Sequence, residues 1–168
     1  SQPELPGRAH PIDMLLMQIA QTMLQRGVRS LERISELPTL LQQLYETYRT
    51  AEWWPRRRAE PINAATLEEI VRRHTLFRES DDDGRHLLWL HDTFQDFVAA
   101  KWLAYDPATG RQRIATADDS PERASELDPA WVVWFDTISR QRGWAEAIPF
   151  LTDLFPASLF AQLVRGWA

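Results

Sequence analysis

The chain has 168 residues, 44% of them hydrophobic, and a formal net charge of −5 at pH 7. This length suits one domain or two small subdomains, and the apolar content, with eight tryptophans, excludes a disordered chain. The net negative charge opposes non-specific attraction to nucleic acid or anionic lipid. The absence of cysteine excludes disulfides and thiolate zinc sites. No stretch has the length of a membrane span and the N-terminus lacks signal-peptide features, so we expect a cytoplasmic protein.

The first part of the chain predicts a helical subdomain over about residues 8–52. Pro11 suits the first turn of a helix that Gly27 ends, and the broad apolar stripe of this helix predicts burial on more than one side. Ser30 is expected to cap a short second helix that ends before Pro38. A third helix follows, whose apolar face consists of Leu41, Leu44, Tyr45 and Tyr48.

Residues 60–104 show the order helix, hairpin, helix that is expected of a winged-helix-like subdomain. Asn63, or the pair of Thr66 and Glu69, begins the first of these helices. Two short apolar stretches, 75–78 and 86–90, then flank an acidic turn at Asp81-Asp82-Asp83-Gly84 and predict a small β-hairpin.

The spacing of apolar residues changes to a helical period after His91. Asp92 followed by Gln95 resembles a capping box, so the next helix is expected to begin at about Asp92. His91 would then lie at a helix N-terminus, where free backbone N–H groups and the helix dipole attract anions. The alternative is a structural histidine that donates to a carbonyl or packs against Trp102.

The last third of the chain predicts a loop and a second helical subdomain. Residues 105–127 are polar and aperiodic, so we expect a loop there. Residues 128–168 begin at Asp128-Pro129 with a helix that stops near Gly143, and two further apolar stripes follow on either side of Pro156. The predicted fold class is therefore mainly α, with one small β-hairpin.

The run from Leu90 to Ala100 resembles the winged-helix segment of NACHT-type STAND nucleotide switches, the NLR-like proteins. Their pattern reads apolar, His, two variable residues, Phe, Gln, Glu, aromatic, apolar, Ala, Ala. The residues that match it as a framework are His91, Phe94, Gln95 and Phe97, and Asp96 stands where the family has Glu. In that family the histidine contacts the phosphate of bound ADP and helps to hold a closed, inactive state. The resemblance implies this role for His91.

The segment from His10 to Leu16 is similar to the one that opens the helical domain after the nucleotide core of these switches. The proline of that segment lies against the adenine, so the resemblance implies an adenine contact for Pro11. The alternative is the common structural use of proline in the first turn of a helix.

The sequence offers no catalytic machinery of its own. It contains no G-x-x-x-x-G-K-[ST] loop to hold phosphates and no H-E-x-x-H arrangement, so we expect neither an enzyme nor a metal site. The resemblance instead implies the regulatory, autoinhibitory part of a signalling switch of the innate-defence type. ADP or ATP would bind only together with the NTPase core of the same parent chain, an ATPase, and exchange would release the chain for self-oligomerisation.

Two other functions remain open. One is a stand-alone helical module that binds another protein and no nucleotide. The other is a winged-helix DNA binder that uses Trp53-Trp54 and Arg56-Arg57-Arg58, with Arg72-Arg73. The aspartates of the acidic turn would meet DNA phosphates with the wrong sign, so a solvated basic linker is the favoured interpretation and nucleic acid the least favoured partner.

Overall fold

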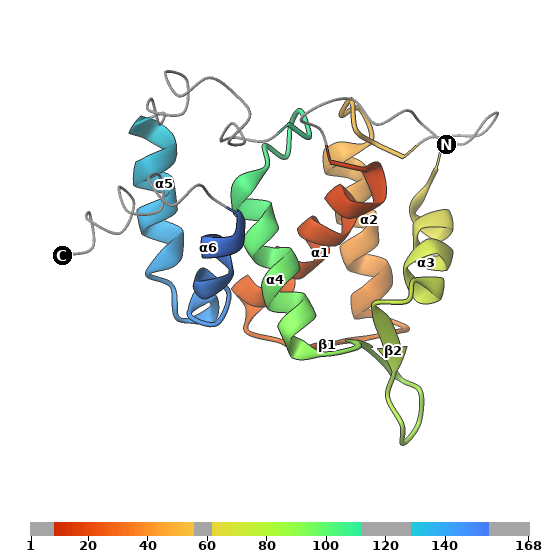
Figure 1. Ribbon diagram of the computed structural model, residues 1–168. Coiled ribbons are helices and arrows are strands. Elements are labelled where there is room, and N and C mark those ends of the chain that lie inside the picture. The colour runs from red at the N-terminus through yellow and green to blue at the C-terminus, as the bar shows by residue number, and fades with distance from the viewer. Residues whose placement is uncertain (1–8, 56–61, 112–128, 155–168) are drawn as a thin grey trace.

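The computed structural model describes residues 9–55, 62–111 and 129–154. Over these residues the protein is mainly helical with a small three-stranded antiparallel sheet (Figure 1), which confirms the predicted class at this level. The helices are α1 (Pro11–Arg26), α2 (Glu36–Tyr48), α3 (Ala64–Arg73), α4 (Asp92–Ala104), α5 (Pro129–Ser139) and α6 (Leu151–Leu154). The strands are β1 (Ser30–Glu32), β2 (Phe77–Glu79) and β3 (His86–Trp89), and two 3₁₀ turns, η1 (Arg142–Trp144) and η2 (Ile148–Phe150), precede α6.

Helix α1 forms the centre of the core. His10 caps it, because its Nδ1 accepts a hydrogen bond from the Ile12 N–H at 3.2 Å, and Pro11 occupies its first position. Gly27 ends it in the left-handed conformation with φ 69°, which glycine adopts without a Cβ penalty. Consecutive residues from Met14 to Ala20 are buried, so the predicted burial on more than one side is confirmed.

The sheet contains the predicted hairpin and one strand that the sequence did not predict. β2 pairs with β3 as expected, and β1 lies on the other side of β3, with Leu31 opposite Leu87. The predicted helix from Ser30 to Pro38 is therefore wrong. Pro38 lies inside the first turn of α2, where proline is tolerated because the first N–H groups of a helix have no acceptor within it.

The carboxylate of Glu32 orders the turn that leads into α2. Its carboxylate accepts hydrogen bonds from the Ile34 N–H at 3.2 Å and from the Ser35 N–H at 2.7 Å, and also from the Ser35 hydroxyl. The hydroxyl and the two N–H groups stabilise the charged form, so the pKa of Glu32 lies below its usual value. A side chain from the preceding strand thus fixes the entry to this helix.

The stretches predicted as separate subdomains, 8–52 and 60–104, share one sheet and one core. β1 comes from the first stretch and β3 from the second. Helices α1 and α4 lie side by side in Figure 1 and run antiparallel, since Gln95 near the start of α4 contacts Val28 after α1, and Trp102 near its end contacts Gln18. The sheet lies below them, and α2 and α3 lie on the side away from α5 and α6.

The C-terminal segment packs against α4 and the end of α1. α5 begins at the predicted Pro129, but the next predicted helix is divided into η1, η2 and α6, with Pro149 inside η2. Trp102 of α4 lies between Trp134 and Trp144, with ring centroids 5.1 and 5.7 Å away. The predicted loop beyond residue 111 and the last predicted helix, after Pro156, lie outside the described residues.

Candidate functional site

His91 lies where the sequence predicts, at the junction between β3 and α4. It is the residue before the first turn of α4, with extended backbone angles, and its exposed side chain makes no capping hydrogen bond. The His91 ring packs edge-on against the Phe94 ring, with centroids 5.2 Å apart. The predicted start of the helix at Asp92 is thus confirmed, while His91, and not Asp92, occupies the capping position. The ring is held against α4 and still faces solvent.

The polar residues of the His91 motif hold α4 to the connection between α1 and β1. Gln95 is fully buried and donates a hydrogen bond from Nε2 to the Val28 carbonyl at 3.0 Å. Asp96 is 5% exposed and pairs with Arg29, whose Nη1 lies 2.7 Å from Oδ1. Gln95 therefore does not complete the capping box that its spacing suggested. Both side chains therefore position the helix against the chain that follows α1.

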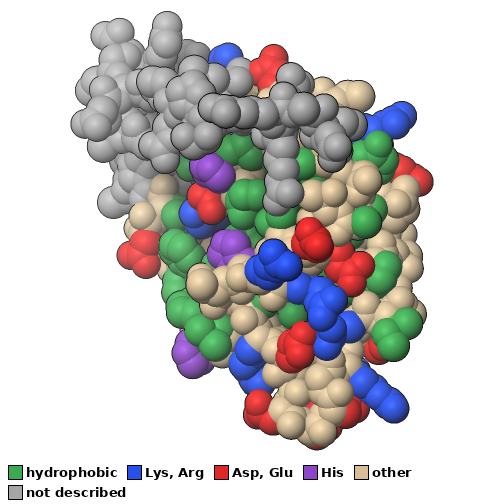
Figure 2. Space-filling view, turned by 90° about the vertical axis from the view of Figure 1, so that its right-hand side faces the viewer, with side chains coloured by type: hydrophobic (Ala, Val, Ile, Leu, Met, Phe, Trp, Pro, Cys, Tyr) green, Lys and Arg blue, Asp and Glu red, His purple; other side chains and the backbone are tan. Residues whose placement is uncertain are grey.

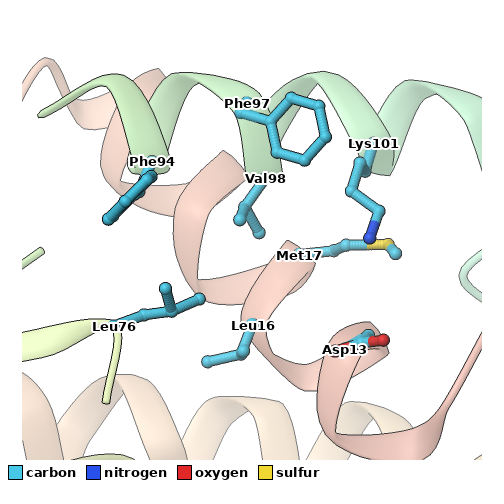
Figure 3. A pocket seen from close by; sticks show the side chains of 8 residues that line it. All are labelled: Asp13, Leu16, Met17, Leu76, Phe94, Phe97, Val98 and Lys101. Atoms are coloured by element: carbon cyan, nitrogen blue, oxygen red, sulfur yellow. The ribbon is translucent and has the colours of Figure 1, made fainter. Parts of the chain in front are cut away.

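The aromatic residues of the motif line a pocket between α1 and α4. Phe94 and Phe97 of α4 border this pocket, which has a volume of about 250 Å³ (Figure 3). Sequence reasoning did not single out the two charged residues that also line this pocket, Asp13 of α1 and Lys101 of α4. The remaining lining residues are Leu16, Met17, Leu76 and Val98.

The structure does not bring Pro11 and His91 together. Pro11 begins α1, whereas the first turn of α4 contacts the residues that follow the end of α1. A helix of this length extends about 24 Å at 1.5 Å per residue, so the two candidate residues lie toward opposite ends of α1. The adenine contact of Pro11 stays a prediction, and the local geometry of Pro11 is that of an ordinary first-turn proline.

The hairpin side of the molecule mixes both signs of charge. Figure 2, which faces α3 and β2, shows Arg or Lys and acidic side chains interspersed on this surface. Arg33 and Arg72 both approach Glu79, at 3.0 and 3.6 Å. The other ion pairs of the hairpin are Arg78 with Asp81 and Arg85 with Asp83. These pairs lower the positive potential that DNA binding would need. The arginines at 56–58, which belong to the candidate DNA-binding patch, lie outside the described residues.

Within residues 9–55, 62–111 and 129–154 there is no group of three side chains that could hold a metal ion. Among the helices of that same part of the chain, none combines the length and apolar character needed to cross a membrane. Comparisons with protein-family models, with curated proteins and with solved structures give no match. The resemblance to NACHT-type switches therefore rests on the two sequence segments around His91 and Pro11.

Proposed function

We propose that this chain is the regulatory, autoinhibitory part of a NACHT-type STAND signalling switch, in which His91 contacts the phosphate of ADP. The observation that carries the proposal is the setting of His91. Its ring is exposed at the N-terminus of a 13-residue helix, braced by Phe94, and makes no capping bond. A phosphate placed there would meet free backbone N–H groups, the positive end of the helix dipole and an imidazole donor.

The order of elements supports the same proposal. From α1 to α4 the chain runs helix, strand, helix, helix, strand, strand, helix, and the sheet order is β1-β3-β2 with antiparallel neighbours. The winged-helix-like order that the sequence predicts over residues 60–104, helix, hairpin, helix, corresponds to α3, β2, β3 and α4. Leu90 alone separates the end of β3 from His91, which immediately precedes α4. This position between a strand and a helix supports the proposed role of His91.

The switch would work by differential contact with the nucleotide. ADP on the NTPase core of the parent chain would reach His91 and favour the closed state, and exchange for ATP would remove that contact and free surfaces for self-oligomerisation. Asp92 places a carboxylate in the first turn of α4, which opposes a phosphate. We therefore propose that the NTPase core neutralises most of the charge of the ADP phosphates. His91 would supply the contact that differs between the ADP-bound and ATP-bound states.

The test is His91→Ala in the parent polypeptide that contains an NTPase core. We expect ADP affinity to fall about 10-fold, the effect of losing one charge-assisted hydrogen bond, and assembly without ATP to rise. Titration calorimetry measures the first effect and light scattering after gel filtration the second. His86→Gln, a substitution of the histidine on β3, is the matched control. Unchanged ADP affinity in the His91 variant would falsify the proposal.

A further inference from the structure

We propose that the pocket between α1 and α4 binds a free α-amino acid with a large apolar side chain, whose two charged groups are held by Asp13 and Lys101. The site is separate from the proposed nucleotide contact, because it uses neither the exposed His91 ring nor the N–H groups of the helix end. The size of the pocket, its apolar walls and the charges at one end point to this ligand.

The size and the walls of the pocket suit one large side chain. Leu16, Met17 and Val98 are buried beneath it, and Leu76 and Phe94 form partly buried walls. Its volume of about 250 Å³ lies below the range of about 300–1,000 Å³ that is usual for cofactors and drug-sized ligands. A nucleotide is therefore too large, whereas an apolar side chain with a small head group fits.

The charged end offers one group of each sign. In Figure 3 the Lys101 ammonium, on the α4 side, and the Asp13 carboxylate, on the α1 side, both lie at the right of the pocket, with the tip of Met17 between them. Leu16, Leu76 and Phe94 lie farther to the left. The Lys101 Nζ lies over the Phe97 ring, 5.8 Å from its centroid. Neither charged group takes part in an ion pair within the described residues.

A zwitterionic head group satisfies both charges at once. The ligand carboxylate accepts hydrogen bonds from the Lys101 ammonium, and the ligand ammonium donates to the Asp13 carboxylate. A simple carboxylic acid would instead bring a like charge to Asp13, and a simple amine would bring one to Lys101. An internal segment of a peptide carries neither charge and could use only the apolar walls. The pair of charges therefore points to a free amino acid.

The first experiment uses the fact that Lys101 is the only lysine of the sequence. Reductive ¹³C-dimethylation keeps the charge of Lys101 and gives one NMR signal from its side chain, with the N-terminal amine as an internal reference. We expect L-phenylalanine and L-leucine to shift the Lys101 signal to saturation, and glycine to leave it unchanged. Phenethylamine and 3-phenylpropionate, which each lack one charge, should bind at least about 10-fold more weakly.

Variants assign the binding to this pocket. Lys101→Met keeps an apolar stem and Asp13→Asn keeps the shape, and each should weaken L-phenylalanine about 10-fold or more by calorimetry. Leu76→Trp should fill the mouth and abolish binding. Glu69→Gln, which removes an exposed carboxylate of α3, is the matched control and should bind as the parent does. Circular dichroism and thermal melting show whether each variant is folded.

Three results would overturn the inference. The first is equal affinity for the amino acid, the amine and the acid, which would mean that the head group is not recognised. The second is tighter binding of N-acetyl-phenylalanine amide, which would make the pocket a docking site for a peptide side chain. The third is no shift of the Lys101 signal up to about 10 mM ligand, ten times the Kd of about 1 mM that characterises a weak site.

Discussion

The two ends of α1 meet their surroundings in opposite ways. At the C-terminal end, the ion pair of Arg29 with Asp96 joins the chain after α1 to α4, and the backbone of Gly143 presses against the last turn of α1. Along the N-terminal half, Asp13 and Lys101 face the same pocket without pairing. One end is closed by polar contacts and tight packing. The other keeps charges and apolar surface available.

This difference separates the residues that hold the fold from those that could bind a ligand. Within the His91 motif, Gln95 and Asp96 contact the closed end, whereas His91 and Phe94 face solvent or the pocket. A match to a functional motif therefore mixes two kinds of residue. The predictions below test this separation through stability.

The largest effect is expected from Arg29→Ala, which leaves the Asp96 carboxylate buried without its cation. Removing one partner of a buried pair costs about 3–5 kcal/mol, and we expect about 2–3 kcal/mol of unfolding free energy here because the Arg29 side chain is 38% exposed. Urea denaturation measures the loss. Arg29→Lys, which keeps the charge, should recover part of it. A loss below about 0.5 kcal/mol would mean that this end of α1 is not held by the pair.

Gly143→Ala tests the packing of the C-terminal segment on the same end. A Cβ at Gly143 would lie 2.4 Å from the Leu24 carbonyl oxygen, so η1, which contains Gly143, must move away from α1. We expect a loss of about 2 kcal/mol, as for other overpacked sites, and altered fluorescence of the neighbouring, buried Trp144.

Gly27→Ala is the matched control for this change. A Cβ at Gly27 meets nothing within 4 Å, but the backbone has φ +69°. The control should therefore lose about 1–2 kcal/mol through backbone strain and leave the Trp144 emission unchanged. Equal fluorescence changes in the two variants would contradict the assigned contact.

The sequence predicts the elements at the C-terminal end of α1 better than the pocket along its N-terminal half, for a physical reason. Apolar residues at helical spacing and Gly27 are strong local signals, so α1 and the start of α4 are predicted correctly. β1 has three residues and one buried side chain, too few to show an alternating pattern, and it needs β3 from far along the chain. Asp13 and Lys101 are likewise distant in sequence, and only the antiparallel packing of α1 and α4 brings them to one pocket.

His91→Ala should leave stability within about 0.5 kcal/mol of the parent value, because the ring is exposed and has no capping role. Thermal unfolding of the 168-residue chain measures this without any nucleotide. A loss above about 1 kcal/mol would favour the structural interpretation of the histidine and weaken the proposed phosphate contact.

The smallest effect on stability is expected from Lys101→Met and Asp13→Asn. Neither charge takes part in an ion pair within the described residues, and both side chains are partly exposed, so their removal should change the unfolding free energy by no more than about 0.5 kcal/mol. Urea denaturation of the two variants and of the double variant measures it. A coupling free energy above about 1 kcal/mol would mean that the two charges stabilise each other in the folded protein. The N-terminal half of α1 would then be held by paired charges, as its C-terminal end is. Asp13 and Lys101 would not be available to a ligand.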